Sequence, residues 1–475
     1  MTEAIDVDLC VIGAGAGGLS VAAGASQMGA SVALFERGEM GGDCLNVGCV
    51  PSKALLAAAH AAHTAGTAGR LGLEMTVAPV DWRRIREHVR GVIAAIAPVD
   101  SVERYEGFGV RVIAAHARFT EPRTVEGGGV TVRAKFVVIA TGSTPSVPPV
   151  PGLDEVPYLT NETVFDLDER PAHLLVLGGG AIGCELAQAH VRLGCRVTLV
   201  EAASLLGAED PEAADVVRLS LQRDGVELRE GVSAVSVGRS GDAIALTVTG
   251  PDGEETLTGS HLLVATGRRV SFDGLDLERA GIATDERGRL VVDARLRTSD
   301  RRVFAVGDAA GGPQFTHVAG AHAGVVIKNA LFRLPAKADH AGVPRVTYTA
   351  PELAQVGPTE ADLRAAGTAF GVLRWPYAEN DRAQAERSVD GFAKVLVAPN
   401  GRILGATVVG DAAGELISIW ALAIAQRLKV GALAGLVVPY PTRAEVIKRA
   451  ASSWYVPKLF GDRTKAVVRF LMRFA

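Results

Sequence analysis

The chain has 475 residues, a formal net charge of −4, 48% hydrophobic residues and 21% charged residues. Its length is sufficient for roughly two to four domains, and the lack of an overall basic charge argues against nucleic acid as a partner. Five cysteines in a chain of this length exclude a secreted disulfide scaffold. The first residues lack the features of a signal peptide, and no apolar run reaches the roughly 18 residues of a membrane span, so we expect a cytoplasmic protein.

The first predicted element is a strand that leads into a glycine-rich turn. The apolar residues 9–12 precede Gly13, Gly15 and Gly18, which have the spacing G-x-G-x-x-G, and a second apolar strand ends at Glu36. In such a unit the glycines allow a tight turn, close approach of a pyrophosphate and packing of the helix on the strand. The helix N-terminus offers free N–H groups to phosphates, and Glu36 is placed to bind ribose hydroxyls. The unit predicts a dinucleotide site.

Two cysteines follow in the segment GDCLNVGCVPSK, residues 42–53. The spacing of Cys44 and Cys49 is compatible with half of a metal site, with two buried small residues, or with a redox disulfide. A zinc site needs about four ligands, and the ten histidines and the other cysteines form no matching second pair. The spacing alone does not decide among these interpretations. The remaining cysteines lie in or beside apolar segments and are expected to be inert packing residues: Cys10, Cys184 and Cys195.

A second copy of the nucleotide unit begins at residue 174. The apolar residues 174–177 precede Gly178, Gly180 and Gly183 at the same spacing, and a following strand ends at Glu201. An acid at this place favours NADH, because it would repel the 2′-phosphate of NADPH. Two complete units predict that two dinucleotides bind.

Each unit is followed by an apolar strand that ends in Ala-Thr-Gly. These strands lie in KFVVIATGS, residues 135–143, and HLLVATGR, residues 261–268. We expect each to return the chain beside its cofactor. A further apolar strand leads into VGDAAGG, where Asp308 is placed to accept a hydrogen bond from a sugar-alcohol hydroxyl.

Together these motifs resemble the FAD-dependent pyridine nucleotide-disulfide oxidoreductases, and within them the dihydrolipoamide dehydrogenase and mercuric reductase branch. Further marks are FTHVA, YTAPELAQVG and ENDRAQAE. The resemblance implies an α/β fold with two Rossmann-like dinucleotide-binding domains, for FAD and NAD, and an α+β dimerisation domain. The implied FAD-binding domain covers residues 1–147 and 271–340, the NAD-binding domain 148–270, the dimerisation domain 341–451 and a basic tail 452–475. A homodimer is implied as well.

By the same resemblance the first cofactor is FAD and the second is NADH, with NADPH disfavoured. The residues implied for the FAD site are Gly13, Gly15, Gly18, Glu36, Lys53, Ala117, Thr141, Gly142, Ser143 and Asp308. Those implied for the NAD site are Gly178, Gly180, Ile182, Gly183, Glu201 and Gly267.

The resemblance also favours one interpretation of the cysteine pair. It implies a redox disulfide in which Cys49 lies next to the flavin and Cys44 exchanges electrons with the substrate. We expect a helix that begins near Pro51 to lower the pKa of the thiolate through its N-terminal dipole. Lys53 is implied to lie near the flavin N5 and to pair with Glu185.

The carboxyl-terminal part departs from the family pattern at one position. Disulfide reductases of the family carry H-P-T-x-x-E, which contributes to the active site of the partner subunit, whereas this chain has Tyr440 and retains Glu445. An imidazole exchanges protons at neutral pH, but a phenol with a pKa near 10 is a poor base. We therefore expect weak lipoamide reduction, unless Tyr440 is an ordinary interface residue and another group moves the protons.

The resemblance thus implies an NAD(P)H-dependent flavoprotein disulfide oxidoreductase with a small-molecule electron acceptor. The reaction is expected to be dihydrolipoamide dehydrogenase-like, with a mercuric ion, a quinone or another acceptor as alternatives. The chain has no carboxyl-terminal cysteine pair and no G-M-T-C-x-x-C module before the FAD unit, so the sequence does not secure mercury reduction. Two other classes stay open: a flavin oxidase or dye reductase that does not use the disulfide, and a flavoprotein scaffold without activity.

The tail predicts an amphipathic helix. Val467, Phe470, Leu471 and Phe474 recur at the spacing of one helix face, and basic residues lie around them. We expect this face to dock on the protein or on its dimer mate, with contact to an anionic membrane as the alternative.

Overall fold

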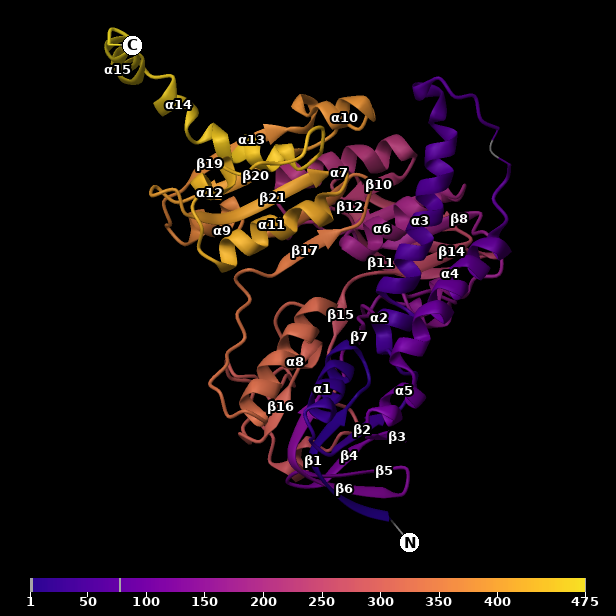
Figure 1. Cartoon of the computed structure of the whole chain (residues 1–475). Helices are drawn as coiled ribbons and strands as arrows, with labels where there is room; N and C mark the ends of the chain where they lie inside the picture. Colours follow the sequence, from indigo (N-terminus) through magenta and orange to yellow (C-terminus); the bar gives the residue numbers. More distant parts are fainter. Residues whose placement is uncertain (1–2, 77, 475) are drawn as a thin grey trace. The chain divides into compact units, whose positions relative to one another are not determined.

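The computed structural model describes residues 3–76 and 78–474, which form two compact units (Figure 1). The first unit holds the described residues up to 178 together with 189–200 and 233–340. The second holds residues 179–188, 201–232 and those from 341 onward. Among the described residues, no helix combines the length and the apolar content needed to cross a membrane.

The first unit is built on a seven-stranded sheet. Its strands follow the order β3-β2-β1-β6-β5-β4, and β16 also pairs with β6. The run Leu9–Ile12 at the end of β1 lies between β2 and β6, parallel to both, and is buried, as expected for an apolar strand covered on both faces. The strands are β1 Glu3–Ile12, β2 Val32–Glu36, β3 Val110–Ala114, β4 Arg118–Glu121, β5 Thr124–Gly127, β6 Val130–Ile139 and β16 Val303–Ala305.

Helices cover this sheet and carry the cysteine segment. Helix α1 packs against α8, and a Cβ at Gly17 of α1 would stand 3.0 Å from Val306 Cγ2 and 3.4 Å from Ala319 Cβ. A helix start was expected near Pro51; α3 begins slightly earlier, at Cys49, and Cys44 lies on the separate short helix α2. The helices are α1 Ala16–Gln27, α2 Gly42–Asn46, α3 Cys49–Gly66, α4 Trp82–Ile96, α5 Val102–Gly107 and α8 Thr316–Ala330, with 3₁₀ turns η1 Ala68–Leu71, η2 Ala97–Asp100, η5 Leu277–Ala280 and η6 Gly307–Ala310.

A second, smaller parallel arrangement repeats the strand, glycine turn, helix and strand order. Strand β8 pairs with β9 and with β14, in parallel on both sides. Helix α6 Ala181–Arg192 follows β8 in the chain. The strands are β8 His173–Leu177, β9 Arg196–Glu201, β10 Glu227–Glu230 and β14 His261–Val264; an antiparallel sheet contains β11 Ser233–Ser240, β12 Ala243–Gly250 and β13 Gly253–Gly259; β7 Thr144–Pro145 pairs with β15 Arg268–Arg269; and the 3₁₀ turns are η3 Leu153–Glu155 and η4 Val164–Asp166.

The second unit contains a five-stranded antiparallel sheet in the order β17-β18-β21-β20-β19. Its strands are β17 Pro344–Thr347, β18 Glu352–Val356, β19 Gly371–Pro376, β20 Phe392–Val397 and β21 Ile403–Gly410. Its helices are α7 Pro211–Asp224, α9 Glu360–Ala365, α10 Asp381–Ala385, α11 Ala413–Ala425, α12 Val430–Ala434, α13 Glu445–Ser453, α14 Val456–Leu459 and α15 Asp462–Leu471, with the 3₁₀ turn η7 Tyr377–Glu379. The predicted α/β class is confirmed.

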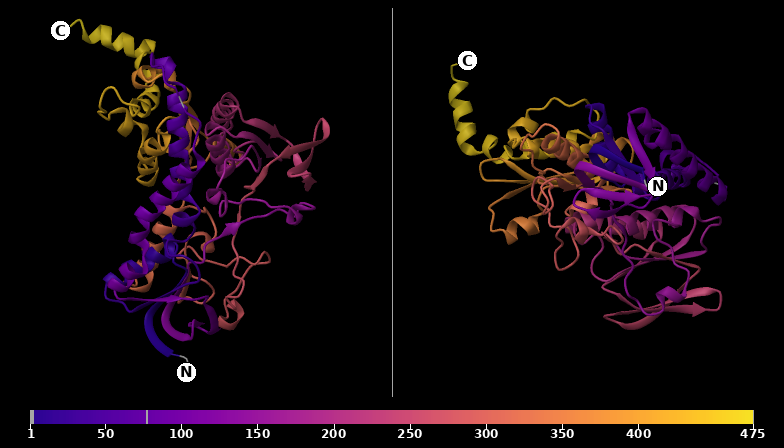
Figure 2. Two further views of the ribbon diagram at one scale, coloured as in Figure 1. Left: turned by 90° about the vertical axis from the view of Figure 1, so that its right-hand side faces the viewer. Right: turned by 90° about the horizontal axis from the view of Figure 1, so that it is seen from below.

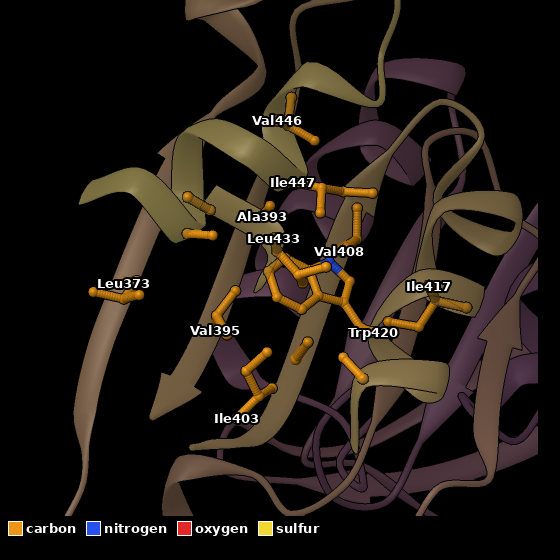
Figure 3. Packing of buried hydrophobic residues seen from close by; sticks show 14 of the residues in the cluster. Leu373, Ala393, Val395, Ile403, Val408, Ile417, Trp420, Leu433, Val446 and Ile447 are labelled. Atoms are coloured by element: carbon orange, nitrogen blue, oxygen red, sulfur yellow. The ribbon is translucent and has the colours of Figure 1, made fainter. Parts of the chain in front are cut away.

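Trp420 lies at the centre of the core of this sheet. The indole on α11 is fully buried and is surrounded by side chains of β20, β21 and α13, among them Val395, Val408 and Ile447 (Figure 3). Its Nε1 has no hydrogen-bond partner among the described residues. The residue stabilises the unit through its buried apolar surface.

A buried ion cluster joins α7 to the same sheet. The Nζ of Lys394 on β20, whose side chain is 6% exposed, lies 2.9 Å from an Asp210 oxygen, 2.8 Å from Glu212 and 3.2 Å from Glu360. A buried ammonium is stable only when it is paired and hydrogen-bonded. This arrangement supplies three carboxylates.

The tail forms a helix that stands away from the sheet of its own unit (Figure 2). Helix α15 ends at Leu471, so the predicted helix is correct, but Phe474 lies beyond its end. Backbone hydrogen bonds from Arg473 to Phe470 and from Phe474 to Leu471 continue the turn. This tightening of the last turn is common at helix ends.

Candidate active site

In the first glycine turn, two glycines are tightly packed against the backbone and a third faces open space. Gly13 has a φ of +105°, and a Cβ there or on Gly18 would overlap backbone oxygens. A Cβ on Gly15, in contrast, would meet no atom within 4 Å. The turn thus has the shape that a pyrophosphate needs to reach the backbone.

Glu36 is fixed at the end of β2 by the turn that it faces. Its Oε2 accepts a hydrogen bond from the Ala14 N–H at 2.6 Å, and its Oε1 accepts one from Gly38 at 2.7 Å. These bonds hold the carboxylate beside the open glycine. Glu36 is therefore preorganised to accept further bonds from ribose hydroxyls.

The second glycine turn holds its glutamate with the same two kinds of hydrogen bond. Glu201 Oε2 accepts a hydrogen bond from the Gly179 N–H at 2.7 Å, and its Oε1 accepts one from Ala203 at 2.8 Å. In both copies the first of these bonds spans 22 residues. A Cβ on Gly180 would again meet nothing within 4 Å, whereas one on Gly178 would stand 2.5 Å from the Ala265 oxygen.

The loop after β6 adds polar groups to the first turn. Ser143 Oγ donates a hydrogen bond to Asp308 Oδ2 at 2.5 Å. The Thr141 hydroxyl is enclosed but has no hydrogen-bond partner among the described residues. A buried polar atom without a partner is costly, so this hydroxyl fits a site that is completed by a polar cofactor. The residues around the first turn therefore fit FAD.

The backbone of the cysteine segment is pressed against the first glycine turn. The Gly41 N–H donates to the Ala14 oxygen at 3.0 Å. Gly42 has a φ of +58°, and a Cβ there would stand 2.7 Å from Gly15 Cα. Only glycine fits at such a left-handed position in close contact with another backbone. The cysteine segment is thus placed directly beside the first glycine turn.

Cys44 and Cys49 lie together as free thiols in this structure. Cys44 is half-buried on α2, and Cys49 is the first residue of α3. Cys49 Sγ lies 3.5 Å from the Thr316 hydroxyl of α8. No bond joins the two sulfurs in this structure, so the predicted disulfide stays a prediction.

The two thiols have opposite pKa shifts. The hydrogen bond from Cys44 lowers the pKa of Cys49 to about 6, and this effect, with the Thr316 hydrogen bond and the charge of Lys53, outweighs the cost of burial. The same hydrogen bond and then burial raise the pKa of Cys44. In the reduced pair Cys44 therefore holds the proton and Cys49 is the thiolate at neutral pH. The place of Cys49 beside the flavin stays a prediction.

Arg268, which was not among the predicted site residues, connects the cysteine segment to the loop after β6. Its Nε donates to Ser143 Oγ and its Nη2 to the Ser143 carbonyl, both at 2.8 Å. The same Nη2 lies 3.2 Å from Asp43 Oδ1, next to Cys44 in the chain. The sequence held one indication of this role: the motif ATGR ends in an arginine where the matching motif ATGS has a serine. Thr316, in FTHVA, was likewise quoted but not assigned.

Tyr440 is exposed, and its hydroxyl is hydrogen-bonded to a residue of its own unit. Its hydroxyl donates a hydrogen bond to Asp381 Oδ2 at 3.0 Å, and 71% of the residue is exposed. The bond to Asp381 raises the pKa of the phenol, with a further contribution from the charge of Glu445. Tyr440 is thus even less suited to act as a base than a free tyrosine.

Several predicted roles stay predictions. Ala117 is buried in the core, so a contribution to cofactor binding would come from its backbone. Glu185 lies on α6 and accepts a hydrogen bond from the Tyr348 N–H at 2.8 Å, and its pairing with Lys53 stays a prediction. The same holds for the roles of Gly142, Ile182, Gly183 and Gly267. The three remaining cysteines are buried, as expected: Cys10, Cys184 and Cys195.

The comparisons with known proteins agree with this geometry. The sequence profile of the pyridine nucleotide-disulphide oxidoreductases matches residues 7–323, and that of their dimerisation domain matches residues 343–451. A mercuric reductase from Streptomyces lividans is 40% identical over 454 residues, covering 94% of this chain and 96% of the relative. A dihydrolipoyl dehydrogenase from Thermus scotoductus is 37% identical over 468 residues, covering 94% and 97%.

A solved structure extends the likeness to the fold. The copper(II) complex of the HOCl-induced flavoprotein disulfide reductase RclA from Escherichia coli has a TM-score of 0.83 and 28% identity, covering 93% of this chain and 98% of that one. The family is FAD-dependent and uses pyridine nucleotides, and the dimerisation domain supports formation of a homodimer. With two glycine turns, two carboxylates that are hydrogen-bonded to these turns, and a cysteine pair whose second member begins α3, the chain belongs to the pyridine nucleotide-disulfide oxidoreductase family.

Proposed function

We propose that the chain is an NADH-dependent reductase that passes electrons through FAD and the Cys44–Cys49 pair to a soft metal ion. When bound, FAD supplies a two-electron carrier between the nicotinamide and the sulfur pair. The chain's own contribution is to keep Cys49 as a thiolate, with a pKa of about 6, while Cys44 holds the proton. Reduction of a divalent ion to the metal consumes one NADH and releases one proton.

The observation that carries the choice of acceptor is the environment of Tyr440. A dithiol–disulfide couple needs a base that takes up and returns protons during turnover. Tyr440 donates its hydrogen to Asp381, and its pKa is raised. A metal ion needs no such base, and thiolates are preferred ligands for soft metals.

The thiols and the similar proteins support a metal ion as the acceptor. Two adjacent thiols can bind a thiophilic ion for the time of its reduction. Among similar proteins, one relative is named mercuric reductase, and RclA was solved as a copper(II) complex.

The test is an acceptor screen with the purified holoenzyme and NADH. Mercuric and cupric ions, lipoamide, glutathione disulfide and a soluble quinone are offered separately, with a lipoamide dehydrogenase as reference. We expect metal-dependent NADH oxidation that is lost in Cys44→Ser and retained in Tyr440→Phe, with weak lipoamide reduction.

Each alternative has its own outcome in this screen. Lipoamide turnover equal to that of the reference enzyme would show a dihydrolipoamide dehydrogenase-like function and refute the proposal, and so would a quinone as the preferred acceptor. Dye reduction that persists in Cys44→Ser, with no metal activity in the parent protein, would indicate a flavin reductase without a disulfide step. Failure of NADH to bleach the bound flavin would identify a scaffold.

A further inference from the structure

The apolar face of the tail is uncovered. Val467, Phe470, Leu471 and Phe474 are each more than half exposed, from 55% to 76%. An apolar patch of this kind usually marks an interaction surface. The face is thus not packed on the sheet of its own unit, docking on the dimer mate stays a prediction, and the question is what covers the face.

The face is continuous in spite of the helix end at Leu471. The backbone turn that follows donates from Phe474 to the Leu471 oxygen at 3.0 Å. The rings of Phe470 and Phe474 lie in edge contact, with centroids 5.2 Å apart. The two aromatic rings and the adjacent Leu471 form the broad end of the face.

Basic residues follow a second row along α15 and the turn after it. Lys465, Arg469 and Arg473 recur every four residues, and residues four apart lie on one side of a helix. With Lys458 and Arg463, residues 456–475 contain five basic residues but a single acid, Asp462. The tail is therefore strongly cationic in a chain whose net charge is −4.

We propose that α15 and the following turn lie on the surface of an anionic lipid bilayer. Aromatic and aliphatic side chains on one face and Lys or Arg on the other are the features of helices that lie in the membrane interface. A second copy of the tail is a poor occupant, because pairing the two apolar faces would bring two cationic segments together. An anionic bilayer suits both rows, because its headgroups attract the basic residues and its acyl boundary accepts the apolar face.

This surface goes beyond the proposed reductase activity. It would hold the enzyme at a membrane without changing the chemistry of Cys44 and Cys49. The tail and the active site can therefore be tested separately.

The experiment is vesicle flotation of the full-length holoenzyme. Vesicles of phosphatidylcholine alone are compared with vesicles that also contain phosphatidylglycerol, at low and high salt. The variants are a chain that ends at residue 455, Phe470→Glu with Leu471→Glu for the apolar face, and Lys465→Gln with Arg469→Gln and Arg473→Gln for the basic row. Thr368→Glu, at an exposed site of the same unit, is the matched control for an added charge.

We expect flotation with anionic vesicles that weakens at high salt. Each basic residue removed should weaken partitioning by roughly fivefold, and the apolar-face variant and the shortened chain should not float. NADH-dependent dye reduction should be the same in all variants, which shows that they are folded. No flotation of the parent protein, or equal flotation of all variants, would overturn the proposal.

Light scattering of the same samples distinguishes the other occupant. If the shortened chain and the Phe470→Glu/Leu471→Glu variant changed the oligomeric state, the face would be an interface between copies of the chain, and the lipid proposal would be wrong.

Discussion

The pKa of the Cys49 thiol depends on its neighbour Cys44. The largest cause of its low value, about 6, is the hydrogen bond from the Cys44 thiol. At pH 7 such a group is roughly nine-tenths thiolate, whereas an ordinary cysteine with a pKa of about 8.5 is only a few per cent thiolate. Replacing Cys44 by Ala removes the donor but leaves Thr316 and Lys53 in place. We therefore expect the pKa of Cys49 in Cys44→Ala to rise by one unit or more, yet to stay below that of an ordinary thiol.

The assay is the pH dependence of alkylation of the reduced enzyme by iodoacetamide, with peptide mapping to assign each modified cysteine. In the parent enzyme Cys49 should react half-maximally near pH 6, and Cys44 should react only at higher pH. Cys44→Ser is the matched control, because its hydroxyl can still donate a hydrogen bond and should keep part of the shift. If Cys44→Ala left the midpoint unchanged, or if Cys44 were the thiolate at pH 7, the explanation would be wrong.

Three further predictions concern the cofactor, the redox segment and the core. Glu201→Ala should reduce the preference for NADH over NADPH roughly tenfold or more, because a like charge no longer faces the 2′-phosphate, as measured by kcat/KM with each cofactor. Arg268→Gln should separate Asp43 from Ser143 and lower the rate of turnover roughly tenfold through misplacement of the thiols, with FAD content unchanged by absorbance. Trp420→Ala should destabilise the second unit by about 3–5 kcal/mol, measured by denaturant unfolding.

Matched variants test the reasons behind these predictions. A parent enzyme that uses NADPH as well as NADH would contradict the role given to Glu201. Arg269→Gln removes an exposed neighbouring arginine and should have little effect, so an equal loss in both arginine variants would argue against the Arg268 contacts. Trp420→Phe keeps most of the apolar surface and removes an N–H without a partner, and it should therefore be much milder than Trp420→Ala.

The sequence predicted the parts of the fold that depend on local demands. Gly13 and Gly178 need left-handed backbone beside another chain segment, so only glycine fits them, and the spacing of such glycines is visible in the sequence. Glu36 and Glu201 end their strands, as predicted. The burial of residues 9–12 follows from their uninterrupted apolar character.

Contacts between distant segments could not be predicted in this way. The bond between Arg268 and Asp43 exists because two loops meet in space, and neither residue shows this in its own neighbourhood. The same applies to Tyr440 and Asp381. The start of α3 was missed for a local reason: a proline is accepted throughout the first turn, where no N–H is needed, so Pro51 does not mark the first residue.

The contact of Gly42 with Gly15 fixes the position of the two cysteines relative to the glycine turn of residues 13–18. Two backbones that touch without side chains between them behave as one rigid piece, so a strain applied at either is felt at both. A methyl group introduced at Gly42 would lie 2.7 Å from the Gly15 Cα. Relief of this overlap would displace both the glycine turn and the sulfur atoms. A substitution at Gly42 should therefore change the reactivity of the two thiols.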